Sequence, residues 1–191
     1  MLEYSIQAFE ECRDITGYVV VTRESDVRRM ERIARRVRAA RLIAVVIGGR
    51  HRADSVRNGL DRLPEQGWVA VHDAARPMVT PGMLSAGASL ARRGLAAVFA
   101  RPVNDTLKRG TPKRLHATVS REGLYAAQTP QFFPIPMLRR AHRHAGRTQA
   151  GATDDCELVE RLGVRPVLLP GPAENIKVTT PGDLRIVKAL L

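Results

Sequence analysis

Short apolar segments alternate with helix-like patterns along most of the chain. Five of these segments are almost continuously apolar and are bounded by turn residues: 18–22, 43–47, 68–72, 96–100 and 166–169. Continuous apolarity over about five residues is typical of a strand that is buried on both faces of a sheet. Between the first two segments, apolar residues recur every three or four positions from Val27 to Val37, which predicts an amphipathic helix.

Further helices are predicted by their starting residues. Thr80 and Thr180 are each followed by proline, and a threonine cap before a proline at the first helical position favours a helix start. Apolar residues at helical spacing predict another helix over residues 53–60. Strands that alternate with helices predict an α/β fold with a mostly parallel sheet, whose ligands bind in the loops after the strands.

One stretch, residues 105–123, interrupts this alternation. It is polar, basic and rich in turn residues, and it has no helical period. Because long structureless loops are uncommon in compact domains, we predict a β-hairpin arm that projects from the domain, with a flexible surface loop as the alternative. A chain of 191 residues is long enough for one domain with its own core, and we expect a single domain over residues 1–191.

The net charge of +12 raises the question of a nucleic-acid partner. Arginine supplies all but four of the 31 basic residues, and only 4% of the residues are aromatic. Base-stacking side chains are therefore scarce, and we interpret the charge as a solvated basic surface with no nucleic-acid partner.

No apolar run is long enough to span a bilayer, so no membrane partner is expected. Two widely separated cysteines fit reduced thiols in a cytoplasmic protein.

Candidate chemistry lies in the loops that follow the predicted strands. After the strand at residues 43–47, Gly48 and Gly49 allow a tight turn and a close approach to a ligand. The next helix begins at once, and its free N–H groups favour an anion. Arg52 and Ser55 could add hydrogen-bond donors there, although a glycine turn before a helix is common.

A carboxylate and a guanidinium follow the strand predicted at residues 68–72. Asp73 could hold Mg²⁺ or accept a hydrogen bond from a substrate hydroxyl, and Arg76 could bind a phosphate. The alternative is an ion pair between Asp73 and Arg76 that only orders the loop. His72, on the strand itself, is interpreted as a hydrogen-bonded core histidine rather than a base.

Three other polar positions are candidates. Lys177 is flanked by apolar residues, so its amine either reaches to solvent or points into a site. Thr129 begins the segment Thr-Pro-Gln-Phe-Phe, and Thr153 precedes two aspartates. Each threonine alone could belong to a turn, and Thr153 could simply cap the helix that carries Leu158.

Six segments form a specific series when they are taken together in order: 53–56, 72–77, 102–108, 129–133, 153–154 and 175–179. This series resembles the 2-C-methyl-D-erythritol 4-phosphate cytidylyltransferase family of the non-mevalonate isoprenoid pathway, over essentially the whole chain. The ribitol-5-phosphate cytidylyltransferases share the fold but resemble the chain less closely at the Asp-Ala-Ala-Arg-Pro loop and at Thr-Pro-Gln-Phe-Phe. The resemblance implies a Rossmann-like nucleotidyltransferase sheet and transfer of CMP from CTP to methylerythritol phosphate, with Mg²⁺ as the cofactor.

The resemblance also implies roles for individual residues. It implies that Arg121 and Lys177 hold the attacking phosphate. The sugar-phosphate pocket would be lined by Asp73, Arg76, Thr129 and Thr153, with Asp73 the candidate metal ligand. The cytidine half of CTP would lie against Gly48, Gly49, Arg52 and Ser55. In this family the arm exchanges between the subunits of a homodimer, so Arg121 would serve the neighbouring subunit's site.

The resemblance is incomplete at the beginning of the chain. The family starts with a strand and a loop of the form Ala-Ala-Gly-x-Gly-x-Arg, followed by Pro-Lys, whereas residues 1–5 here already match the helix that comes next. We therefore expect the first strand to be absent and its neighbours to have unpaired edges. Without that cationic loop, transfer should be severely slowed, since removing even one preorganised donor commonly costs about 10²–10³-fold. Two explanations stay open: a start site assigned too late, or a truncated homologue that binds ligand or a partner without turnover.

Overall fold

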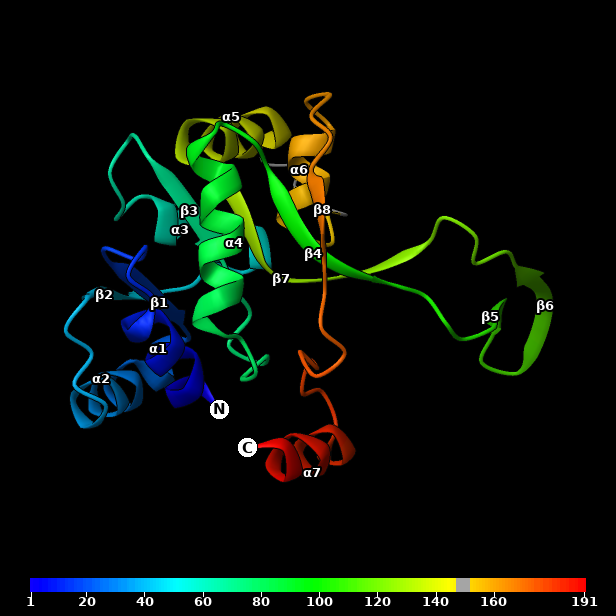
Figure 1. The fold of residues 1–191 in the computed structure, drawn as a ribbon, viewed down its shortest axis with the longest axis horizontal. Helices are drawn as coiled ribbons and strands as arrows, with labels where there is room; N and C mark the ends of the chain where they lie inside the picture. The colour runs from blue at the N-terminus through cyan, green and yellow to red at the C-terminus, as the bar shows by residue number, and fades with distance from the viewer. Residues whose placement is uncertain (147–151) are drawn as a thin grey trace.

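The computed structural model describes residues 1–146 and 152–191 and has a mixed α/β fold (Figure 1). The helices are α1 (Leu2–Glu11), η1 (Glu24–Asp26), α2 (Val27–Arg36), α3 (Arg52–Leu60), α4 (Pro81–Arg92), α5 (Ile135–Ala145), α6 (Asp155–Glu160) and α7 (Pro181–Leu190). The strands are β1 (Tyr18–Thr22), β2 (Leu42–Ile47), β3 (Trp68–Val71), β4 (Ala97–Pro102), β5 (Leu107–Thr111), β6 (Arg114–Val119), β7 (Tyr125–Pro134) and β8 (Val167–Pro170). The predicted alternation of strands and helices is confirmed.

The main sheet has the strand order β3-β7-β4-β8, and β1 forms a separate parallel pair with β2. Strand β8 runs parallel to β4, as predicted, but β7 runs antiparallel to both β3 and β4. The sequence pattern missed β7 because buried polar residues interrupt its apolar character. Gln128, Thr129 and Gln131 are all at most 6% exposed, and their side chains find hydrogen-bond partners inside the protein.

The core lies on both faces of β7. Phe132 and Phe133 are fully buried, and successive side chains of a strand point to opposite faces. Phe132 packs in a cluster with Leu84 of α4, whereas Phe133 packs in a second cluster with Leu138 of α5 and Leu158 of α6. Strand β7 therefore contacts both helical layers. Because β7 also pairs with β3, it helps to position the residues that follow β3.

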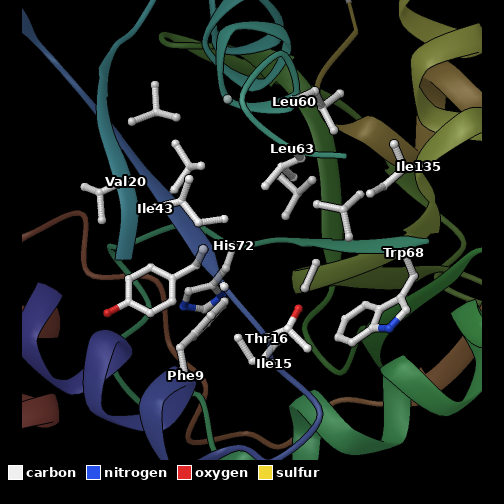
Figure 2. A pocket seen from close by; sticks show the side chains of 18 of the residues that line it. Phe9, Ile15, Thr16, Val20, Ile43, Leu60, Leu63, Trp68, His72 and Ile135 are labelled. Carbon is white, nitrogen blue, oxygen red and sulfur yellow. The ribbon is translucent and has the colours of Figure 1, made fainter. Parts of the chain in front are cut away.

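An apolar cavity of about 450 Å³ lies between β1 and β3. Figure 2 shows Val20 and Ile43 on one side of it and Trp68 on the other, with Phe9 and His72 nearby. Within the described part of the chain, β1 pairs only with β2, and β3 pairs only with β7. The edges of β1 and β3 that face this cavity thus have no strand partner among the described residues.

Strands β5 and β6 form an antiparallel hairpin that stands away from the rest of the protein at the end of two extended segments (Figure 1). Its side chains are exposed almost throughout, and Leu115 is 68% exposed. None of the described helices is long and apolar enough to cross a bilayer.

Candidate active site

Asp73, in the loop after β3, is the centre of a cluster of charges. Asp73 accepts a hydrogen bond from Lys177 at 2.8 Å (Oδ2 to Nζ), and its Oδ1 lies 3.6 Å from Nε of Arg52. Burial alone would raise the pKa of Asp73, but the two cations outweigh it, so the pKa lies below its ordinary value. Asp73 is thus an ionised carboxylate at the carboxyl end of a strand, where ligands of such sheets bind.

The loop after β3 is held by a chain of hydrogen bonds through Thr129 of β7. The backbone N–H of Asp73 donates to Thr129 Oγ1 at 3.0 Å. The same Thr129 hydroxyl oxygen lies 3.2 Å from Nδ1 of His72. Nε2 of His72 lies 3.1 Å from the carbonyl oxygen of Arg76. The carbonyl can only accept, so His72 donates from Nε2, and its Nδ1 accepts from the Thr129 hydroxyl. This neutral form fits the predicted core histidine, and burial lowers the pKa of His72 to about 4.

The neutral His72 should make stability depend on pH. The pKa of His72 is about 4 in the folded protein and about 6.5 when unfolded, so between these values the unfolded chain binds more protons. We expect the free energy of unfolding to fall by up to about 3 kcal/mol as the pH drops from 6.5 to 4. Urea denaturation across this range measures the slope. His72→Gln should flatten it, whereas His144→Gln, at an exposed position, should not. An unchanged slope in His72→Gln would contradict the assignment.

Arg76 does not pair with Asp73, so the predicted alternative of an ion pair between them is wrong for the described structure. Its guanidinium instead donates to the carbonyl oxygens of Asn175 (2.7 Å) and Ala127 (3.4 Å). Arg76 therefore joins the loop after β3 to the segment that carries Lys177. This contact explains how residues about a hundred positions apart in the sequence reach one site.

The glycine turn after β2 lies beside this cluster. A side chain at Gly49 would collide with Asp54, since an added Cβ would lie 2.2 Å from the Asp54 Cβ. The backbone N–H of Gly49 donates to Ser55 Oγ at 3.1 Å, and this hydroxyl donates to the carbonyl of His51. Gly48 is equally confined, because its added Cβ would lie 2.7 Å from Ser55 Oγ. The turn thus presents the N-terminus of α3, where Arg52 is the first residue.

Two predicted site residues lie outside the cluster. Arg121, at the base of the arm, is exposed and donates a hydrogen bond to the carbonyl oxygen of Asn104. Thr153 donates from its backbone and its hydroxyl to Glu157. The cap of α6 is Asp154, which accepts from the backbone N–H of Glu157, so the alternative prediction that Thr153 caps this helix is wrong.

Sequence reasoning missed two buried polar residues that support the cluster. Asn175 is fully buried and donates to the side chain of Gln128 and to the carbonyl of Thr129. Asp155 is also fully buried and accepts from Arg52 at 2.6 Å. Their sequence signal was weak, since an aspartate at a helix start and an asparagine in a loop are both ordinary there.

The described residues do not fit a metal ion held by the protein alone. No group of three or more metal-binding side chains gathers among them. Asp73 was the predicted ligand, but both of its oxygens face cations, Lys177 and Arg52, which compete with a metal for the same lone pairs. We therefore assign no step of the chemistry to a metal bound by Asp73.

Comparisons with known proteins agree over the full length of the chain. Residues 1–191 match the family profile described as IspD: 2-C-methyl-D-erythritol 4-phosphate cytidylyltransferase. The protein of that name from Halalkalibacterium halodurans is 37% identical over 191 residues, covering 100% of this chain and 84% of that protein. The one from Desulforamulus reducens is 42% identical over 194 residues, covering 100% and 83%.

Solved structures give the same result. A crystal structure of a 4-diphosphocytidyl-2C-methyl-D-erythritol synthase superposes with a TM-score of 0.86 at 36% identity, covering 99% of this chain and 89% of that one. The 2-C-methyl-D-erythritol 4-phosphate cytidylyltransferase from Thermus thermophilus superposes with a TM-score of 0.81 at 31% identity, covering 99% and 87%. The predicted nucleotidyltransferase fold is thereby confirmed.

Proposed function

Because the chain belongs to the 2-C-methyl-D-erythritol 4-phosphate cytidylyltransferase family, we infer that it transfers CMP from CTP to 2-C-methyl-D-erythritol 4-phosphate. The products are 4-diphosphocytidyl-2-C-methyl-D-erythritol and pyrophosphate, in non-mevalonate isoprenoid biosynthesis. The geometric observation that carries the assignment is the cluster of Lys177, Asp73 and Arg52 between the glycine turn and the loop after β3. Its two cations and one carboxylate support a site for phosphorylated substrates.

In the proposed reaction, a phosphate oxygen of methylerythritol phosphate attacks the α-phosphorus of CTP in line. The bond from the α-phosphorus to the bridging oxygen breaks, and pyrophosphate leaves with the electron pair. The protein contributes chiefly position and positive charge. Lys177 is suited to hold the attacking phosphate, because its side chain is 47% exposed and its amine lies beside Asp73.

The remaining roles follow from position. Asp73, ionised and fixed by Thr129, is suited to accept hydrogen bonds from the hydroxyls of the sugar alcohol, and Arg76 lies in the same loop. Thr153, which bonds to Glu157 outside the cluster, is proposed for that side of the pocket from the family resemblance alone. The turn at Gly48, Gly49 and Ser55, together with Arg52, is suited to the cytidine half of CTP, since glycines let a ligand approach the backbone closely and Arg52 is the first residue of α3 beside them. Magnesium is proposed to accompany the triphosphate, its usual ligand in such enzymes.

We propose that the chain is one cytoplasmic domain with a dimerisation arm at about residues 105–123. Arg121 contacts Asn104 rather than the charge cluster, so within one subunit the cluster has no contribution from it. An exposed hairpin with an exposed Leu115 is suited to pack against a second copy of the chain. Exchange of arms would then supply Arg121 to the neighbouring subunit's site. The buried free thiols Cys12 and Cys156 fit a reducing compartment.

A comparison of acceptor substrates tests the proposed function. Pyrophosphate release should require CTP together with methylerythritol phosphate, and ribitol 5-phosphate should support it at least about 100-fold less well, because a pocket built for one set of hydroxyls rejects another. Equal or greater kcat/KM with ribitol 5-phosphate would favour a ribitol-5-phosphate cytidylyltransferase. Calorimetric binding of both substrates without pyrophosphate release would favour a homologue that binds but does not turn over.

A further inference from the structure

A fully buried carboxylate lies directly behind the charge cluster. Asp155 is 0% exposed, and each of its carboxylate oxygens has a partner. Oδ2 lies 2.6 Å from Nη1 of Arg52, and Oδ1 lies 3.2 Å from Nε2 of His142. A buried carboxylate that loses its partners is costly, so these contacts fix the side chains on both sides.

The backbone at Asp155 is held as firmly as its side chain. Gln131 of β7 is 1% exposed, and its Oε1 accepts from the backbone N–H groups of Asp155 and Cys156 at 3.2 and 3.3 Å. Its amide nitrogen donates to Asp154 at 2.7 Å. Asp155 is therefore anchored to the main sheet, and it offers Arg52 a rigid acceptor.

Arg52 lies between two carboxylates that differ in distance and in exposure. Its Nη1 is 2.6 Å from Asp155, whereas its Nε is 3.6 Å from Asp73, beyond a good hydrogen bond. Asp73 instead has its short contact with Lys177, at 2.8 Å. The buried carboxylate thus holds the guanidinium back and leaves Asp73 and Lys177 paired with each other.

We propose that Asp155 is the positioning residue for Arg52 in this reaction. By holding one edge of the guanidinium, it keeps Arg52 at the start of α3 facing the nucleotide and prevents it from closing onto Asp73. The inference rests on the proposed function, in which Arg52 faces CTP. Without the charge of Asp155, Arg52 would turn toward Asp73, and it would compete there with Lys177.

A double-mutant cycle tests this role. Asp155→Asn and Arg52→Gln are made singly and together, and kcat/KM for CTP is measured by pyrophosphate release. Each single variant should lose roughly 10–100-fold, since displacement of a positioned group by about 1 Å costs that much. The double variant should lose no more than Arg52→Gln alone, because Asp155 acts only through Arg52. Calorimetry also measures the affinity of the same four proteins for CTP, which gives a second double-mutant cycle that does not depend on turnover.

The matched control is Asp14→Asn, which removes another Asp–Arg contact (2.8 Å, to Arg92) away from the site and should leave kcat/KM unchanged. A purely structural role of Asp155 predicts multiplied losses in the double variant, which would overturn the proposal. Unaltered CTP binding and kcat/KM in Arg52→Gln would overturn it as well. If the unsubstituted protein releases no pyrophosphate, the proposed function fails, and the cycle in CTP affinity still decides the role of Asp155.

Discussion

Replacing Lys177 with alanine is expected to lower kcat/KM for CMP transfer by about 10²–10³-fold, the usual cost of removing one fixed cationic or hydrogen-bonding group from a transition state. Lys177 has the shortest contact to Asp73 in the cluster, and its side chain is still 47% exposed, so its amine can reach an incoming phosphate. A steady-state assay of pyrophosphate release, with methylerythritol phosphate varied, measures the loss.

The matched control for this change is Lys188→Ala. Lys188 is an exposed lysine in the last turn of α7, and the described structure gives it no contact with the cluster. Its replacement should leave kcat/KM within about twofold of the starting value, since surface substitutions are usually mild. If Lys177→Ala kept the same kcat/KM as Lys188→Ala, the assignment of Lys177 to the attacking phosphate would be wrong.

The second large effect is expected at the arm. Arg121→Ala alone should lower activity by about 10²-fold or more, for the same reason as Lys177→Ala. A mixture of the two inactive variants should regain activity if the arm serves the neighbouring subunit. A heterodimer then holds one site with both intact residues, so random mixing restores about a quarter of the sites.

Each variant mixed with itself provides the baseline for that experiment, and size-exclusion chromatography checks that dimers form and exchange. Recovery near a quarter of the unsubstituted activity supports exchange of the arms. No recovery from dimers that do exchange would mean that Arg121 acts within its own subunit or plays no part in the reaction, and the proposed dimeric site would have to be abandoned.

Local sequence chemistry predicted much of the fold. Thr80 and Thr180 were expected to cap helices, and each hydroxyl accepts from a backbone N–H three residues on, at 3.2 Å. The five apolar segments were predicted as strands because continuous apolarity is typical of strands, and they form β1, β2, β3, β4 and β8. The expected burial on both faces is wrong for β2 and β8, where Ile43 is 52% exposed and Leu168 is 43% exposed. Strand β7 had no such signature, because its buried glutamines and threonine depend on partners from distant segments.

Some residues of the candidate site could likewise be predicted from the sequence, and others could not. Asp73 was predictable from its place after a strand, but no local pattern shows that Lys177 and Arg52 meet it, because the fold alone brings them together. Arg76 was predicted as a phosphate ligand or as a partner of Asp73. In the structure its outer nitrogens donate to the carbonyls of Asn175 and Ala127. Residues that organise a site through buried contacts are the hardest to recognise from one sequence.

CMP transfer to methylerythritol phosphate is tested most directly by identifying the product formed from α-³²P-labelled CTP and this acceptor. The label is expected in 4-diphosphocytidyl-2-C-methyl-D-erythritol, identified by its mass, with one pyrophosphate released for each molecule formed. This product should be absent when methylerythritol phosphate is omitted, and much reduced with Lys177→Ala. Label that stays in CTP, or that moves to ribitol 5-phosphate in preference, would contradict the proposed activity.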